Sequence, residues 1–412
     1  MSLWVEPALI IRKGVDFVLY IGIDIASKKH DCCIMGQNAE ILAPVFTFEN
    51  NVEGYEMLLK NIHNHERDFS KVKIGLESTG HYGSNLISFL QAKGFGVVIF
   101  NPLQVDLYRK ASTLRKTKTD KADAKFIAQM LITTESSTSL PIDPNIVELK
   151  AFVRHRTRMK SMRTRLKVSV NRLVTILFPE FHAAVSTIHQ VSSYALLVEL
   201  PSAEAIRDCH LTRLTNLLSA SSKKRYGRDK AVEIKSLAQT SIGSNSSAVG
   251  FELQQTIRLI NNLDAEMKIL DRQIKLMMIE INSPILSIPG ISYNLGSIIL
   301  AEIGNIENFS NPSKLLAYAG LEPSTHQSGS YLATRTSMVK RGSTYLRWAI
   351  LQAAKLAAQH DATFKAYATK KRQEGKHYYV VLNHVGKKLI RVIFHLLKNN
   401  QEFVCMEQHS VL

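Results

Sequence analysis

The chain has 412 residues, of which 45% are apolar and 21% charged, so it is long enough for two or three folded domains and too apolar for wholesale disorder. Lysine and arginine number 52 against 35 acidic residues, which gives a net charge of +17. This excess favours a nucleic-acid partner. The alternatives are an acidic lipid and a basic protein without a polyanionic partner. The four cysteines lack zinc-site spacing, and Pro289 and Gly290 interrupt the most apolar stretch, so we expect neither a zinc site nor a membrane span.

Short β-like runs and helical patterns alternate over the first third of the chain. Three strands joined by hairpins are predicted over 18–26 (VLYIGIDIA), 30–36 and 40–49, followed by a helix over 52–62, a strand over 73–78, a helix over 82–92 and a strand over 96–101. A basic loop is expected after Pro102, and then a helix over about 120–131. This order is that of an RNase H-like or RuvC-like α/β domain, although other mixed α/β domains share it.

Helical patterns dominate the rest of the chain. Residues 144–181 are helical and very basic, and 150–167 contain no acidic residue. Residues 182–249 are less regular and include a Ser-rich stretch that predicts a loop over 240–250. The apolar stripe over 251–281 is typical of an antiparallel or dimeric coiled-coil arm, 285–304 fits a helix-hairpin-helix pattern, and the remainder to about 397 is mostly helical.

Two predicted strands carry an acidic residue among apolar neighbours. Asp24 lies within the apolar run 21–25, and Glu77 ends the run 74–77. A buried carboxylate without a partner is costly, and the predicted strand order places these two acids side by side. Asp120 and Asp123 stand three residues apart at the start of a predicted helix and therefore share one face.

Four carboxylates that converge from two strands and a helix repel one another unless cations fill the site. Mg²⁺ (or Mn²⁺) prefers carboxylate and water oxygens, and two such ions about 4 Å apart stabilise the attacking and leaving oxygens of a phosphoryl transfer. The predicted catalytic metal ligands are Asp24, Glu77, Asp120 and Asp123. Singly, each has an ordinary alternative: an acid at a helix N-terminus, a buried acid bonded to a neighbouring strand, or the start of an exposed turn.

Several phrases resemble a known family. They are YIGIDIASKKHD (20–31), IGLESTGHYG (74–83), NPLQV (101–105), RKTKTDKADA (115–124), IPGISYNLGSIILAEIG (288–304), AYAGLEPSTHQSG (317–329) and KRGSTYLRWAILQAA (340–354). Together they resemble the DEDD transposases of insertion sequences of the IS one-ten type, relatives of the Piv and MooV invertases. KTDKADA and GLEPSTHQSG are the specific ones.

The resemblance implies more than the residues show by themselves. It implies a RuvC-like N-terminal domain whose four acids are the DEDD set, and a C-terminal transposase domain with a nucleophilic serine that maps to Ser328. It also implies action on DNA ends and target, a structured guide or bridge RNA in at least some members, a homodimer that assembles to a tetramer, and a site completed by a partner subunit. Gln327 stands where the family often has serine.

Without the resemblance, Ser328 would not stand out. Ser324, Thr325 and Ser330 are equally plausible by composition, and most serines in loops are turn residues. A serine nucleophile needs a base or a metal, for which either His326 or the carboxylate site could serve.

The basic residues predict surfaces for a nucleic-acid backbone, although solvated helix faces are the simpler alternative. The predicted contacts are Arg109, Lys110, Arg115, Lys116, Lys118, Arg154, Arg156, Arg158, Lys160, Arg163, Arg165, Lys340, Arg341 and Arg347. Phosphate contacts of this kind specify no sequence.

The expected organisation is an N-terminal extension (1–17), a RuvC-like DEDD domain (18–140), a helical linker and coiled-coil arm (141–284), a C-terminal transposase domain (285–400) and a tail (401–412). We expect a transposase or site-specific recombinase in the cytoplasm of a prokaryotic cell, at the nucleoid, with reduced cysteines. The first alternative is a RuvC-like junction resolvase that hydrolyses DNA, and the second is a scaffold whose acids are structural.

Overall fold

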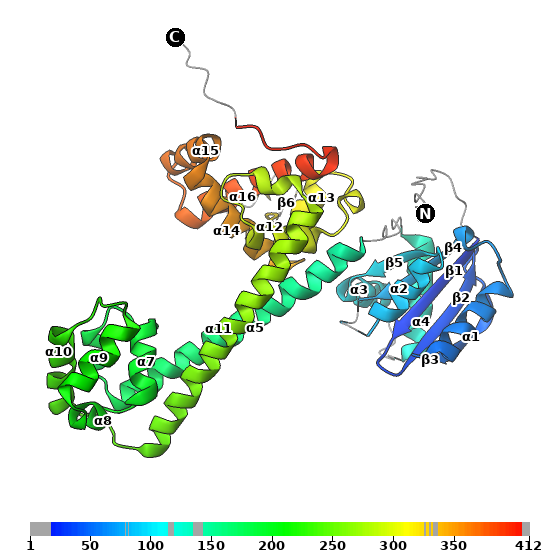
Figure 1. Ribbon diagram of the computed structural model, residues 1–412. Helices are drawn as coiled ribbons and strands as arrows, with labels where there is room; N and C mark the ends of the chain where they lie inside the picture. The colour runs from blue at the N-terminus through cyan, green and yellow to red at the C-terminus, as the bar shows by residue number, and fades with distance from the viewer. Residues whose placement is uncertain are drawn as a thin grey trace, which may run out of the picture. The chain divides into compact units, whose positions relative to one another are not determined.

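A computed structural model describes residues 18–78, 80, 82–113, 119–134, 143–324, 327–328, 331–332 and 337–405 (Figure 1). The chain divides into two compact units, Met1–Pro141 and Ile142–Leu412. Within the described residues, every helix is too short or too polar to cross a membrane.

The N-terminal unit is built on a mixed five-stranded sheet. The strands are β1 (Leu19–Ile25), β2 (Lys29–Gly36), β3 (Ile41–Glu49), β4 (Val72–Glu77) and β5 (Gly96–Phe100), in the order β3-β2-β1-β4-β5. β1 is antiparallel to β2 and parallel to β4. The helices are α1 (Val52–His63), α2 (Ser84–Ala92), α3 (Pro102–Ser112) and α4 (Asp120–Thr133), with a 3-10 turn at Phe69–Lys71. The predicted α/β order with three leading antiparallel strands is confirmed.

Helix α3 occupies the segment for which the sequence predicted a basic loop, so that prediction was wrong. The Asn101 side chain accepts a hydrogen bond from the Leu103 N–H at 2.9 Å, and the Gln104 side chain accepts one from the Asn101 N–H at 3.3 Å. Pro102 takes the first helical position, where its missing N–H costs nothing. The phrase NPLQ therefore encodes a capped helix start, which outweighs the polar composition that follows.

One glycine lets α4 lie directly on the sheet. A Cβ atom added at Gly22 of β1 would lie 2.1 Å from the carbonyl oxygen of Ala124 and 2.3 Å from the amide nitrogen of Ala128. Both atoms belong to the α4 backbone, which cannot yield as a side chain could. Helix and strand therefore approach more closely here than any other residue type allows.

Two long helices run side by side through the second unit (Figure 1). They are α5 (Pro144–Leu177) and α11 (Ser247–Ile281), and their ion pairs Arg156–Asp271, Arg163–Asp264 and Arg172–Glu252 show that they are antiparallel. This antiparallel pair forms within one chain. The wider prediction of a coiled-coil arm remains a prediction.

Five short helices lie between α5 and α11, in the region that the sequence indicated was less regular. They are α6 (Phe181–Ala184), α7 (Val191–Glu199), α8 (Ala203–Asp208), α9 (Leu211–Ser221) and α10 (Arg228–Gln239). Their apolar residues share a core with Leu173 of α5 and Ile257 of α11. The predicted loop over 240–250 is also shorter than expected, because the Ser246 side chain caps α11 from Ser247 onward.

The C-terminal helices form the other core of this unit. They are α12 (Tyr293–Ile303), α13 (Pro312–Tyr318), α14 (Thr344–His360), α15 (Ala362–Gln373) and α16 (Tyr378–Asn399), with 3-10 turns at Pro284–Ser287 and Ile306–Asn308 and short strands β6 (Gln327–Ser328) and β7 (Tyr331–Leu332). Within 285–304, left-handed Gly290 joins a 3-10 turn to α12. The helix-hairpin-helix assignment remains a prediction.

Gly22→Ala tests the contact between β1 and α4. The added methyl group forces the α4 backbone away from the sheet, so we expect a loss of about 2 kcal/mol or more in the free energy of unfolding of the N-terminal unit. Gly227→Ala is the matched control, because a Cβ atom there meets nothing within 4 Å. Chemical denaturation measures both variants, and equal stabilities would contradict the close approach.

Candidate active site and nucleic-acid interface

Asp24 and Glu77 lie side by side at the ends of two parallel strands. The register pairs Ile23 with Leu76, and the next residues on these strands are Asp24 and Glu77. Neighbouring strands are roughly 4.8 Å apart. Because Gly22 faces α4 and side chains alternate along a strand, Asp24 points to the same face as the helix.

The first turn of α4 supplies the other two predicted acids. The Thr119 side chain caps the helix by accepting a hydrogen bond from the Ala122 N–H at 3.3 Å. Asp120 and Asp123 both lie in the first turn, where Asp120 is exposed and Asp123 is buried. The contact at Gly22 fixes this turn over the end of β1.

The electrostatics of Asp24 show that these acids share one environment. Burial is the largest of several effects that raise the pKa of Asp24 from 3.8 to about 7. The negative charges of Asp123, Asp120 and Glu77 add to the rise, followed by that of Asp31. The pKa of Asp24 is therefore raised chiefly because the side chain is buried, and further because other carboxylates lie near it.

Asp31 is an acid of this site that the sequence reading did not select. It lies opposite Asp24 in the antiparallel pair β1–β2, it is 6% exposed, and it accepts a hydrogen bond from the Thr47 hydroxyl at 2.6 Å. Pairing 20–25 with 30–35 across the hairpin would have placed it there. The sequence did not show which face of the sheet the Asp31 side chain occupies, because the run HDCCIMG does not alternate between polar and apolar residues.

Arg109 of α3 reaches the same site. Its guanidinium lies 3.3 Å from Asp123 and 2.5 Å from Asp106, while Lys110 lies 2.7 Å from the other oxygen of Asp106. Both residues were predicted to contact nucleic acid, and both are engaged here with acidic side chains. Arg115, Lys116 and Lys118 lie outside the described residues.

The donor chemistry of this site fits a hard divalent cation. Carboxylate oxygens are the ligands that Mg²⁺ and Mn²⁺ prefer, and after burial the charges of Asp123, Asp120 and Glu77 contribute to the raised pKa of Asp24. Over the described part of the chain, however, no three acidic, histidine or cysteine side chains are already placed to ligate one ion. Arg109 holds Asp123 in this arrangement, so ion binding requires side chains to move.

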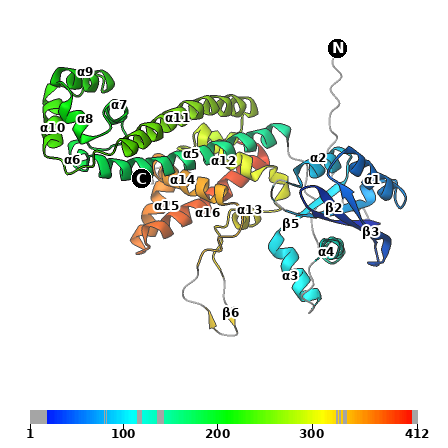
Figure 2. The ribbon, with the colours of Figure 1, turned by 90° about the horizontal axis from the view of Figure 1, so that it is seen from below.

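Ser328 lies in the second unit, in the segment that connects α13 to α14. Two hydrogen bonds join the two sides of this segment where it leaves the helices. The Ser324 N–H donates to the Ser337 carbonyl at 2.7 Å, and the Val339 N–H donates to the Glu322 carbonyl at 2.8 Å. Farther along, Ser328 pairs with Tyr331 in the ladder β6–β7, which stands apart from the helices (Figure 2). His326, Thr325 and Ser330 lie outside the described residues.

Half of the basic residues predicted on α5 are engaged inside the unit. Arg154 binds the fully buried carboxylate of Glu302 at 2.8 Å, and the Ser343 hydroxyl donates to the same carboxylate at 2.8 Å. Arg156 and Arg163 pair with acids of α11. Although burial acts to raise the pKa of Glu302, these hydrogen bonds and nearby cations hold that pKa below its usual value.

The other predicted cations of this unit face outward. Arg158, Lys160 and Arg165 are exposed on α5, and within the described residues none has an acidic partner. Lys340 and Arg341 are exposed as well, whereas the Arg347 guanidinium donates to the Lys340 carbonyl at 3.1 Å and so orders the segment before α14.

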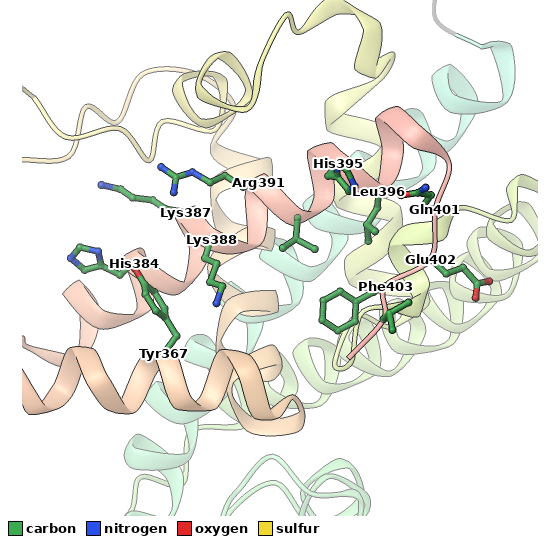
Figure 3. A pocket seen from close by; sticks show the side chains of 12 residues that line it. Tyr367, His384, Lys387, Lys388, Arg391, His395, Leu396, Gln401, Glu402 and Phe403 are labelled. Atoms are coloured by element: carbon green, nitrogen blue, oxygen red, sulfur yellow. The ribbon is translucent and has the colours of Figure 1, made fainter. Parts of the chain in front are cut away.

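A second basic surface was missed by the sequence reading. It consists of His384, Lys387, Lys388, Arg391 and His395, which we call the α16 basic face. These residues line an open cavity of about 970 Å³ that also includes Tyr367 of α15 (Figure 3). Burial and the charge of Arg391 lower the pKa of Lys387, although Glu322 opposes them. Spacings of three and four residues along 384–395 were the available signal.

Comparison with known proteins identifies the family. A family model of DEDD transposases of IS110 elements, described as "Transposase", matches residues 21–179, and one described as "Transposase IS116/IS110/IS902 family" matches 282–369. The chain belongs to this transposase family. It is 24% identical to the pilin gene-inverting protein of Moraxella bovis, over 93% of this chain and 97% of that protein.

The similarity covers both units of the transposase. The "Insertion element IS116 uncharacterized 44.8 kDa protein" of Streptomyces clavuligerus is also 24% identical, over 93% of this chain and 96% of its own length. The predicted family is thus confirmed, and with it an enzyme that acts on DNA. The four acids predicted to form the DEDD set fall in the first matched segment, and Ser328 falls in the second.

The pKa of Asp24 makes a prediction about stability. With a folded-state pKa of about 7 and an ordinary value of 3.8, the folded protein binds the additional proton, so this group lowers stability as pH rises through that window. In EDTA, we expect Asp24→Asn to melt above wild type by roughly a few degrees at pH 8 and by clearly less at pH 5, where only the lower part of the window from 3.8 to about 7 has been crossed. Mn²⁺ should raise the melting temperature of wild type at pH 8 more than that of the variant.

Thermal melts followed by circular dichroism measure these shifts. Asp229→Asn is the control, because Asp229 is an exposed acid of α10 in the other unit. A variant that differs from wild type equally at pH 5 and pH 8 would contradict the raised pKa of Asp24.

Proposed function

We propose that this transposase recombines the ends of an insertion sequence with a target by means of a divalent-metal carboxylate site and the nucleophile Ser328. The observation that carries the proposal is the convergence of Asp24, Glu77 and the first turn of α4, where burial, followed by the charges of the neighbouring acids, raises the pKa of Asp24 to about 7. Such a concentration of like charge suits cation-assisted phosphoryl transfer.

In this mechanism Asp24, Glu77, Asp120 and Asp123 hold Mg²⁺ or Mn²⁺. The bound ions supply Lewis-acid stabilisation of charge on the phosphate oxygens. Asp31, held by Thr47, orients the sheet side of the site and adds to its negative charge. Arg109, which pairs with Asp123, lies at the edge of the site and would be available to a phosphate of the strand once a cation took its place at Asp123.

The covalent step is assigned to the serine. The Ser328 oxygen attacks the phosphorus of a DNA phosphodiester, a serine–phosphate bond forms, and one ester oxygen of the strand leaves as a free hydroxyl that takes up the serine's proton. The reverse attack by a hydroxyl of another strand rejoins the DNA and restores the serine. Because Ser328 and the acids belong to different units, a site completed by a partner subunit satisfies the same chemistry.

The partners follow from the family and from charge. We propose the element's DNA ends and target as substrates, a structured bridge RNA as guide, a homodimer that assembles to a tetramer, and action at the nucleoid. The relative from Moraxella bovis is named for the inversion of a pilin gene, which is also a rearrangement of DNA. The exposed cations Arg158, Lys160 and Arg165, and the α16 basic face, supply backbone contacts.

Recombination of a plasmid-borne element tests this function. We expect wild type to recombine and to form protein–DNA adducts that survive denaturing gels, Ser328→Ala to abolish both, and Asp24→Asn to reduce both at least about a hundredfold. Ser324→Ala is the matched control and should retain activity. Cutting without rejoining, with no adduct in wild type and no effect of Ser328→Ala, would instead favour a junction resolvase that hydrolyses DNA. Cutting and rejoining that persist in Ser328→Ala would contradict the serine as nucleophile.

The α16 basic face makes a separate prediction about binding. Lys387→Gln combined with Arg391→Gln should lower the slope of log affinity against log salt concentration by about two, since each phosphate contact contributes about 0.9. Arg207→Gln is the control, because that arginine is paired with Asp208 at 2.8 Å. Fluorescence anisotropy with labelled duplex DNA measures the slope, and an unchanged slope would remove this surface from the interface.

A further inference from the structure

A cavity of about 370 Å³ opens on the second unit where α5 passes α12 and α14. Its walls include Tyr345 and Trp348 of α14 and Lys160 of α5, and its hydroxyl groups include Thr157 and Ser161. The mechanism proposed above uses none of the aromatic residues. The cavity lies within one compact unit, so its walls are fixed by the packing of that unit.

Trp348 is the feature that needs an explanation. It is 43% exposed, although α14 buries Leu346, Ala349 and Ile350 around it in the core. An indole presented to solvent at a cavity mouth, beside the further ring of Tyr345, is a platform on which a planar group can stack.

Cations surround both rings. The ammonium of Lys160 lies 5.0 Å from the centre of the Trp348 ring, and the guanidinium of Arg154 lies 5.2 Å from that of Tyr345. Arg154 is already bound to Glu302, whereas Lys160 is exposed, and among the described residues no acid pairs with it. Lys160 therefore remains available to an anion that arrives with the stacked group.

The rest of the lining consists of Arg156, which is paired with Asp271, the apolar Ile298 and four hydroxyl side chains. Ser161 and Thr344 present hydroxyl groups that can donate or accept hydrogen bonds, and no carboxylate is among the described lining residues. The hydroxyls of Thr157 and Thr164 donate to backbone carbonyls and can accept from a ligand. A cationic ligand would find no counter-charge here. A planar group with mixed donors and acceptors and an attached anion would match every wall.

We propose that this cavity binds an unpaired nucleotide of a polynucleotide strand, with the base on Trp348 and its phosphate at Lys160. The inference deepens the proposed function and rests on it for the presence of nucleic acid. In a duplex the faces of the bases are covered by their neighbours, so only an unpaired or displaced nucleotide can enter. DNA and RNA share this chemistry, and the experiment separates them.

The chain provides its own probe, because it has two tryptophans, Trp4 and Trp348. In a Trp4→Phe background, all tryptophan emission comes from Trp348. We expect a short single-stranded DNA or its RNA equivalent to quench this emission saturably, and the same DNA as a duplex to quench it weakly at equal phosphate concentration. Whichever of the two strands, DNA or RNA, quenches the emission at the lower concentration is the type of nucleic acid that the cavity prefers.

Affinity measurements complete the test. Trp348→Ala should weaken binding of the single strand about tenfold, since one base stacked on an aromatic ring contributes about 1–3 kcal/mol, and should leave duplex binding unchanged. Trp348→Phe should retain most of the affinity. Tyr379→Ala is the matched control, because Tyr379 is a 71% exposed aromatic residue on α16 outside the cavity.

Three outcomes would overturn the inference. They are equal losses of single-strand and duplex affinity in Trp348→Ala, no loss of either, and a change of Trp348 emission with protein concentration alone in a protein whose self-association Trp348→Ala abolishes. The last would assign the surface to a second copy of the chain. Adduct formation with Ser328 intact is scored in parallel, so failure of the cavity and failure of the proposed nucleophile appear in different assays.

Discussion

The N-terminal unit depends on the close approach of α4 to β1 at Gly22. A backbone-to-backbone contact of this kind leaves no side chain between helix and sheet, so the first turn of α4 lies directly over the strand ends. The turn carries Asp120 and Asp123, and the strand ends carry Asp24 and Glu77. Repulsion among these charges is the cost of that geometry. It is why a hard cation would stabilise the unit as well as serve its chemistry.

In the second unit a comparable constraint is the buried carboxylate of Glu302. A charge with no exposure must be fully paired, and Arg154 of α5 and Ser343 at the cap of α14 provide that pairing. The three residues tie the long helix to the C-terminal helices. The arginines on one side of α5 therefore form ion pairs inside the unit. Arg158 and Lys160 lie on the other side and are exposed.

The sequence predicted the features that depend on the periodicity and the order of residues along the chain. The strands follow from the alternation of polar and apolar residues, and the long helices α5 and α11 follow from the 3.6-residue period. The family follows from specific phrases. It failed where tertiary contacts decide. Asp31 became part of the site through its register opposite Asp24, and the short helices α6–α10 are held by a shared core rather than by long patterns of their own. The α5 arginines looked alike in sequence and differ because acids of α11 and α12 lie opposite only some of them.

Strand exchange places a particular demand on such a protein. Cutting and rejoining transiently leaves bases without partners, and an unstacked base in water loses contacts that an aromatic surface can replace. A surface that contacts phosphates alone does not read the bases, so it does not sense whether a base is paired. A cavity that pairs the Trp348 ring with the Lys160 ammonium can, since it requires an open base face and a phosphate together. The proposed chemistry and the proposed cavity are therefore complementary: one breaks the strand, and the other favours the unpaired state in which exchange occurs.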